Sequence, residues 1–337
     1  MSYLTVIDEF GLVLPLVVDV GLVCIFAVCG LVWRRQVDKI VPFAVPMTWI
    51  GALAALFVQG AMYDRDLVIF VFLLAWSAWQ AGFLLARALK RSGSDTRSDS
   101  VKQSGPQFAV MWIVIAVSTW TQLLPFTLLH SPIVGSEGGN GAFEEFEFAT
   151  DYAGVVILAI GTVLNVSSDL HKYIWLSRNR NGVMRQGAWA TCRHPSYFGH
   201  VLMLWGVWIM VTTIAGTDDD FFDGRARAAL WASVVGPIFF TLFTIFVLVP
   251  TAERAAARQH MAVSQGVDSA NYQTYQRYVE RTSPLIPFPS FLYRRVPAVI
   301  QKTVFLDFAS SSSSSSVEPH MVGHKLPDSI STTRTDV

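Results

Sequence analysis

The sequence has few charged residues and little cysteine. Only 15% of its 337 residues are charged, whereas a soluble domain usually has about 25%. The 25 basic and 25 acidic residues cancel, so net charge gives no reason to expect a nucleic-acid partner. Three cysteines do not make a disulfide framework. The sequence also lacks a Gly-Lys-Ser/Thr phosphate loop, a strand-borne Gly-x-Gly-x-x-Gly pattern and a Cys-x-x-Cys pair.

Hydrophobic residues make up 52% of the chain and include 11 Trp and 23 Phe. This composition excludes a disordered chain and disfavours an ordinary soluble fold. A helix that crosses a bilayer needs about 20 predominantly apolar residues. We therefore predict an all-α, polytopic membrane helix bundle of about seven transmembrane helices. The apolar runs are roughly residues 11–33, 41–62, 67–89, 108–129, 152–166, 197–215 and 229–249; the fifth is expected to continue through Asp169 toward Leu176.

The basic residues of the loops predict the orientation of these helices, because cytoplasmic loops carry an excess of Lys and Arg. Counted loop by loop, 22 basic residues fall on one side of the membrane and three on the other. The alternation is unbroken and predicts the N-terminus outside and the C-terminus in the cytoplasm. Residues 1–300 are then the membrane domain. Residues 301–337, with seven serines at 310–316, read as a disordered cytoplasmic tail.

Three polar clusters lie on the predicted cytoplasmic side, where polar groups at membrane depth suggest a site. In the first, Asn165 and Asp169 are four residues apart and share a helix face, and Lys172 follows three residues later. An amide, a carboxylate and an ammonium group can meet the hydrogen-bonding edges, ribose hydroxyls and phosphates of a nucleotide. The alternative is polar contact between helices with a Lys that snorkels.

The second cluster runs from Arg178 through Arg193-His194-Pro195-Ser196-Tyr197 to His200 and flanks the start of a helix. A helix N-terminus with cations nearby can bind an anion, and Tyr197 offers a hydroxyl. The alternative is a positively charged anchor with an interfacial tyrosine. The third cluster holds Glu253, three tyrosines at 272, 275 and 278, and Arg281. It reads either as a cytoplasmic lid over a cofactor or as a membrane-surface helix. The histidines lack the spacing of a metal site, and no metal is predicted.

In order along the chain, these clusters resemble the steroid 5-alpha-reductase C-terminal-domain family, in particular its uncharacterised membrane relatives. The matching segments are Trp76-Ser-Ala-Trp79 through Arg87, Gly93-Ser-Asp95-Thr-Arg97, Leu124-Pro125, Ser168-Asp169-Leu-His-Lys172, Gly187-Ala-Trp189, Arg193-His-Pro-Ser-Tyr-Phe-Gly199, Glu253 and Arg281-Thr-Ser-Pro-Leu-Ile-Pro287. The resemblance implies that NADPH binds from the cytoplasmic side, with Asn165, Asp169 and Tyr197 at the cofactor and Arg178 and Arg193 near its phosphates.

The implied reaction is reduction of a carbon–carbon double bond of a lipid or steroid-like substrate that arrives from the bilayer, with Tyr197 as proton donor. The expected cofactor-binding residues are Asn165, Asp169, Lys172, Arg178, Arg193, His194, Ser196, Tyr197, Glu253 and Arg281. An endoplasmic-reticulum membrane is the family-level expectation if the source is eukaryotic. The chain departs from the family where Ser196 replaces Asn and His200 replaces Glu, and the early helices lack the Glu and Tyr that polarise an enone carbonyl.

A second family shares part of the pattern. Isoprenylcysteine carboxyl methyltransferases and phospholipid methyltransferases carry an Arg-His-Pro-x-Tyr-x-Gly segment similar to Arg193–Gly199 and a Glu that corresponds to Glu253. That resemblance implies S-adenosylmethionine in place of NADPH. The pair Asn165/Asp169 and the upstream Trp–Arg region favour the reductase. A non-catalytic relative or another seven-helix protein also fits the composition and topology.

Overall fold

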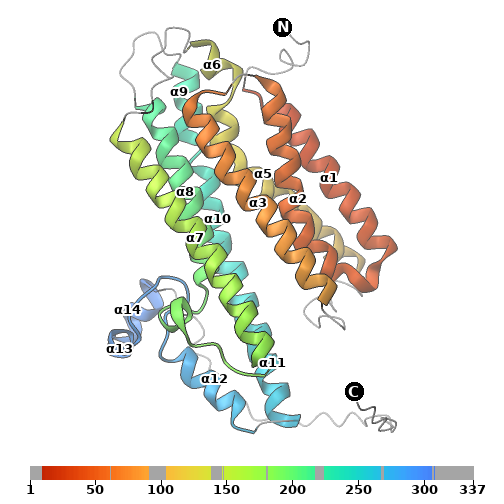
Figure 1. Cartoon of the computed structure of the whole chain (residues 1–337), viewed down its shortest axis with the longest axis vertical. Coiled ribbons are helices and arrows are strands. Elements are labelled where there is room, and N and C mark those ends of the chain that lie inside the picture. Colours follow the sequence, from red (N-terminus) through yellow and green to blue (C-terminus); the bar gives the residue numbers. More distant parts are fainter. Residues whose placement is uncertain are drawn as a thin grey trace.

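The computed structural model of the chain describes residues 10–60, 62–90, 104–137, 146, 148–179, 181–216, 224–266, 269–305 and 307. Within these residues the chain is a bundle of long helices with a smaller group of short helices at one end (Figure 1). The long helices are α1 (Val13–Val32), α2 (Val37–Gln59), α3 (Asp64–Lys90), α5 (Gly105–Leu129), α7 (Ala149–Arg178), α8 (Pro195–Ala215) and α11 (Val249–Gly266). The shorter ones are η2 (Arg34–Gln36), α6 (Pro132–Glu137), η4 (Gly187–Ala190), α9 (Gly224–Ala232), α10 (Val235–Phe243), the π-helical η5 (Thr244–Leu248), α12 (Asn271–Val279), α13 (Ser290–Tyr293) and α14 (Ala298–Thr303).

Seven spans in the described residues are long and apolar enough to cross a membrane, which confirms the predicted all-α bundle and makes the chain a multi-pass membrane protein. The fifth predicted run continues as one helix, α7, to Arg178. The seventh span is built from α9, α10, η5 and α11. Its chain turns between α9 and α10, where Gly236 lies so close to α5 that a Cβ atom there would sit 2.3 Å from the Thr121 carbonyl oxygen.

The α7–α8 pair is the most extensive helix contact of the described bundle, and glycines face backbone across it. A Cβ atom on Gly161 would lie 2.6 Å from the Gly199 carbonyl oxygen, and one on Gly206 would lie 2.5 Å from the backbone nitrogen of Leu158. Small residues at helix interfaces let membrane helices approach in this way. The two helices are therefore held at a fixed spacing along much of their length.

Buried charges join α3, α7 and α8 at the end of the bundle where α3 begins. Arg65 pairs with both carboxylate oxygens of Asp151, each at 2.7 Å, and Asp151 also accepts from Thr213 at 3.0 Å. Next to this pair on α3, Asp66 lies 3.2 Å from the His130 ring. Both contacts are buried, so this end of the bundle is fixed, and the polar clusters predicted from the sequence lie toward the other end.

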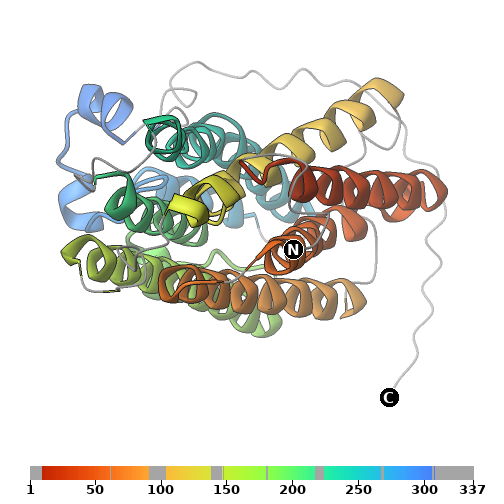
Figure 2. The same cartoon turned by 90° about the horizontal axis from the view of Figure 1, so that it is seen from above.

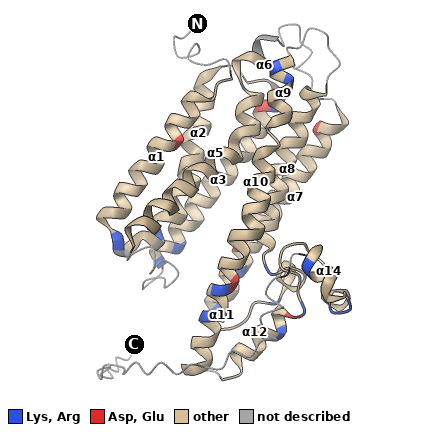
Figure 3. Cartoon of the chain, turned by 180° about the vertical axis from the view of Figure 1, so that it is seen from behind, with Lys and Arg blue, Asp and Glu red and all other residues tan. Residues whose placement is uncertain are grey.

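The chain beyond α8 extends the bundle at that other end. Figure 1 shows α7 and α11 continuing past the end of α3, with α12, α13 and α14 grouped beside them. In Figure 3, Lys and Arg of the described residues gather around the end of α3 and along α11 to α14, with fewer near α6 and α9. The sides of the membrane on which these ends lie stay a prediction. The predicted domain boundary at residue 300 falls inside α14, and Asp307 is buried. The packed chain therefore reaches at least Asp307, and only the rest of the predicted disordered tail, residues 308–337, lies outside the described residues.

Candidate functional site

A buried polar cluster connects α3, α7 and α8. The Asn165 side-chain oxygen accepts hydrogen bonds from the Trp76 indole at 3.0 Å and from Gln80 at 2.8 Å, and its amide nitrogen donates to the Ser196 carbonyl at 2.8 Å. One turn along α7, the Asp169 carboxylate accepts from the side chains of Ser196 and Gln80, and the charges of Lys172 and Arg87 act on it. We call Gln80, Asn165, Asp169 and Ser196 the polar cluster. It brings together three of the residues predicted to bind cofactor.

An aromatic cluster adjoins the polar cluster at Trp76, whose indole donates to Asn165. The His200 ring packs against Trp76, Trp49 and Phe240, with centroid distances of 4.7, 5.9 and 4.4 Å. These four residues come from four helices, α8, α3, α2 and α10. The His200 Nε2 and the Trp49 Nε1 are both buried without a hydrogen-bond partner. Two unpaired buried nitrogens in an apolar setting are costly, and a ligand with a polar atom would satisfy them.

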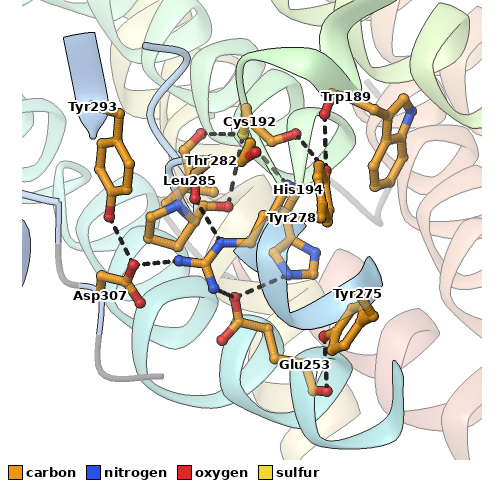
Figure 4. A network of polar contacts seen from close by, with 12 residues as sticks. Trp189, Cys192, His194, Glu253, Tyr275, Tyr278, Thr282, Leu285, Tyr293 and Asp307 are labelled. Atoms are coloured by element: carbon orange, nitrogen blue, oxygen red, sulfur yellow. Dashed lines mark hydrogen bonds and ion pairs between the residues drawn. The ribbon is translucent and has the colours of Figure 1, made fainter. Parts of the chain in front are cut away.

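Arg193 is the centre of a third group, which we call the Arg193 network. Its guanidinium donates to Glu253 at 2.5 Å, to Asp307 at 2.5 Å and to the Thr282 carbonyl at 2.9 Å. Figure 4 shows these three partners converging from separate parts of the chain, with Tyr293 donating to Asp307 at 2.7 Å. Each of the three guanidinium nitrogens thus donates to a protein oxygen.

The C-terminal segment is fastened to the loop before α8 by backbone contacts. Cys192 and Ser283 form an isolated parallel β-bridge, and the Arg193 amide donates to the Ser283 carbonyl at 2.8 Å. The Cys192 thiol donates to the Leu285 carbonyl at 2.7 Å, and the Tyr278 hydroxyl donates to the Trp189 carbonyl at 2.9 Å. The third predicted cluster thus packs against the second. Tyr275 and Tyr278 are buried within the protein, so these two are not exposed aromatic anchors of a membrane-surface helix. A cofactor beneath this segment stays a prediction.

Burial and the Arg193 network shift the pKa values of its titratable groups. Burial raises the pKa of the Cys192 thiol to about 12 and also raises the pKa values of Tyr275 and Tyr278. Burial acts to lower the pKa of Arg193, but Glu253 and Asp307 outweigh it and the pKa is raised. Burial lowers the pKa of His194, and the opposing effect of Glu253 is smaller. The network therefore holds a fixed cation, neutral tyrosines and a thiol that stays protonated.

The other predicted residues are placed as follows. Tyr197 stacks on His194, with ring centroids 5.3 Å apart and an interplanar angle of 7°. His194 in turn lies 3.8 Å from Glu253. The Lys172 ammonium lies over the Trp189 ring, 4.0 Å from its centroid. Arg178 and Arg281 are exposed, and the described residues show no ion pair from either to another predicted site residue. Their predicted contact with cofactor stays a prediction.

Four residues that complete these groups were not predicted as site residues. Gln80 and Trp76 belong to the predicted Trp–Arg helix, but nothing in the spacing showed which residue of α7 they meet. Trp49 carries no sequence signal beyond its apolar run. Asp307 lies beyond the predicted domain boundary. Within the described residues no group of three His, Cys, Asp or Glu could hold a metal ion.

Acid should destabilise the protein through His194. The charged groups that face it are Glu253, Lys172 and Arg193. Its folded-state pKa lies below the ordinary 6.5, so as the pH falls through 6.5 the unfolded chain takes up a proton that the folded chain resists. Stability then falls with falling pH, by at most about 1.4 kcal/mol per pH unit. Thermal unfolding in detergent between about pH 5 and pH 7.5 should show a shallower slope for His194→Gln. His171→Gln, at an exposed histidine, is the matched control; equal slopes in both variants would contradict the assignment.

Comparison with known proteins gives one family. The family model described as "Protein of unknown function (DUF1295)" matches residues 32–279. This range begins before α2 and ends with α12, so it contains the polar cluster and the aromatic cluster. Of the Arg193 network it contains Arg193 and Glu253, whereas Thr282, Tyr293 and Asp307 lie beyond it. No curated protein and no solved structure matches the chain.

Proposed function

We propose that this chain, which belongs to the DUF1295 family of membrane proteins, is an NADPH-dependent oxidoreductase of the bilayer. Its substrate would be a lipid with an activated carbon–carbon double bond. The observation that carries the proposal is the junction of the polar and aromatic clusters at Trp76. The Trp76 indole N–H bonds to Asn165, and the Trp76 ring packs on His200. A water-soluble cofactor and an apolar substrate need such neighbouring surfaces to meet.

The donor set of this region fits a dinucleotide. Asp169 provides a carboxylate that can accept from ribose hydroxyls, and Lys172 and Arg87 are cations close enough to act on it electrostatically. The buried His194 Nε2 lies 3.8 Å from a Glu253 carboxylate oxygen, beyond hydrogen-bond distance. Carboxylates for hydroxyls and cations for phosphates are the usual partners of a nucleotide. Arg193, by contrast, is occupied by Glu253 and Asp307, so its part would be to fix the loop that carries His194 and Tyr197.

The aromatic cluster fits the reacting end of the lipid. When bound, NADPH supplies a hydride to the double bond. The Trp49 indole is a donor only, and the unpaired nitrogens of Trp49 and His200 could hold the carbonyl oxygen of an enone while the surrounding rings exclude water. In this proposal the pair takes the role of the early-helix Glu and Tyr, which the chain lacks. The Tyr197 hydroxyl remains the predicted proton donor that completes the reduction.

Cofactor binding to the purified full chain tests the proposal. A ligand that binds only the folded state stabilises it by about 2.7 kcal/mol at a hundredfold excess over Kd, so NADPH should raise the thermal midpoint in detergent. Asp169→Asn removes a charged acceptor, which costs about 1.5–3 kcal/mol and should weaken NADPH binding about tenfold or more. Asp64→Asn makes the same chemical change at an exposed position at the start of α3, away from the polar cluster. This control should leave the thermal shift with NADPH intact.

The other outcomes decide against the reductase. Stabilisation by S-adenosylmethionine alone would point to the methyltransferase resemblance. A shift with neither ligand would favour a non-catalytic relative. If NADPH binds and Asp169→Asn binds it equally well, the cofactor lies elsewhere and the polar cluster only joins helices. If NADPH does bind as proposed, loss of the NADPH absorbance on adding an enone lipid would then establish the reaction.

A further inference from the structure

The segment that follows α12 exposes apolar side chains although it lies outside the seven spans. Phe291 is 67% exposed, Val299 71% and Val304 56%. Ile286, Leu292 and Ile300 are exposed as well. Large exposed apolar groups that gather in one place mark an interaction surface. We call residues 286–304 the C-terminal patch.

The C-terminal patch is folded, so the exposure does not come from a loose chain. Tyr293 is fully buried and packs edge-on against Phe305, with ring centroids 5.2 Å apart. Phe305 also meets Phe288 at 5.1 Å. These three rings form a small core beneath α13 and α14. The remaining apolar residues therefore face outward because the inner face is already filled.

The charge of the patch has one sign. Arg294, Arg295 and Lys302 are exposed, and residues 284–306 contain no acidic residue. The next acid, Asp307, is buried against Arg193. A surface that combines exposed apolar groups with basic ones suits the headgroup region of an anionic bilayer, where apolar groups enter the acyl boundary and cations meet phosphates.

The position of the patch allows this contact. Figures 1 and 3 place α13 and α14 beside the bundle, near the level at which α3 ends, whereas α12 and the end of α11 lie farther along. Seen from above, in Figure 2, the C-terminal helices lie at the edge of the bundle, on the side away from α1. A membrane around the seven spans would have its surface at this level, next to the patch.

We propose that the C-terminal patch is an interfacial anchor that binds the surface of an anionic lipid bilayer. Phe291, Val299 and Val304 would enter the boundary of the acyl chains, while Arg294, Arg295 and Lys302 reach the lipid phosphates along their flexible stems. Since Asp307 and Thr282 flank the patch and both bind Arg193, the anchor also fixes the loop at the start of α8 relative to the membrane. This inference does not depend on the proposed reaction.

Depth measurement on the full chain in nanodiscs tests the proposal. Cys24 and Cys29 are replaced by serine, and buried Cys192 stays. A nitroxide is attached to Val299→Cys or, as the matched control, to Gln273→Cys on an exposed position of α12. Collision with oxygen, which concentrates in lipid, is compared with collision with a water-soluble nickel chelate. At Val299 oxygen should dominate, and at Gln273 the nickel chelate should dominate. A water-like result at Val299 would overturn the proposal, and so would shielding from both reagents, which would indicate a protein partner or a second copy.

Varying the lipid charge tests whether the C-terminal patch binds anionic headgroups or only the apolar part of the bilayer. Discs of phosphatidylcholine alone are compared with discs that contain phosphatidylserine, and the oxygen preference at Val299 should increase in the anionic discs. Arg295→Glu with Lys302→Glu should abolish that increase. Arg258→Glu with Arg277→Glu, an equal charge change at exposed positions of α11 and α12, should preserve it. Equal responses of the two double variants would overturn the role of the basic residues.

Discussion

Replacement of Arg193 by methionine is expected to lower the free energy of unfolding by about 3–5 kcal/mol, because removal of one partner from a buried ion pair leaves the other charge uncompensated. Here two carboxylates would lose their cation. The side chains of Arg193 and Asp307 are 3% and 1% exposed, so water cannot replace the missing contacts. The Thr282 carbonyl would lose its donor as well. Since Glu253 belongs to α11 and Asp307 to the chain beyond α14, the variant should release the C-terminal segment from the start of α8.

Cys192 provides the measurement. Its thiol is buried next to Arg193 and kept protonated by its raised pKa, so with Cys24 and Cys29 replaced by serine a thiol-reactive dye reports opening of this region. Arg193→Met should react at much lower temperature than the parent. Arg277→Ala removes an exposed arginine and should change stability by less than about 0.5 kcal/mol. Equal labelling temperatures for Arg193→Met and Arg277→Ala would mean that the network contributes little.

Much of the fold follows from the sequence because its signals are local. A run of about 20 apolar residues suffices to identify a spanning helix, and seven spans were expected and are present. The pairing of Asn165 with Asp169 on one face of α7 is equally local, since residues four apart on a helix are neighbours. Both side chains do meet the same partners, Gln80 and the Ser196 residue.

The remaining contacts depend on which helices pack together, and spacing carries no such information. Gln80 meets Asn165 across 85 positions of sequence, and Asp307 meets Arg193 across 114. The turn between α9 and α10 also depends on a neighbour, because it is the approach of Gly236 to α5 that places the chain there. In each case the deciding contact lies on an element remote in sequence.

The segment from Arg193 to Gly199 shows how packing accounts for a compact sequence pattern. Arg193 binds the C-terminal chain, Pro195 begins α8 where a missing N–H has no cost, and the Ser196 carbonyl accepts from Asn165. Gly199 touches the backbone of α7. The order of these residues is thus explained by structure alone. The case for a bound cofactor rests instead on the charges around Asp169, and that for an apolar substrate rests on the unpaired nitrogens of His200 and Trp49.

Gly199→Ala should destabilise the protein by about 3 kcal/mol, the upper end of the usual cost of overpacking. The new Cβ would lie 2.6 Å from both the Asn165 backbone nitrogen and the Gly161 carbonyl oxygen. Neither backbone atom can turn away as a flexible side chain would, so α8 must move from α7. That movement would also stretch the 2.8 Å bond from Asn165 to the Ser196 carbonyl, and NADPH binding should weaken together with stability.

The same substitution at Gly82 is the matched control, because its effect on stability is expected to have the opposite sign. Gly82 is exposed in α3, and a Cβ atom there meets nothing within 4 Å. Alanine is the better helix former by about 1 kcal/mol, so Gly82→Ala should leave the unfolding temperature unchanged or raise it while Gly199→Ala lowers it. The unfolding temperatures of both variants and of the parent, measured in the same detergent, test this difference. Equal shifts would mean that the α7–α8 contact yields without cost. The fixed spacing of the two helices would then have to come from the Asp151–Thr213 hydrogen bond at their far end.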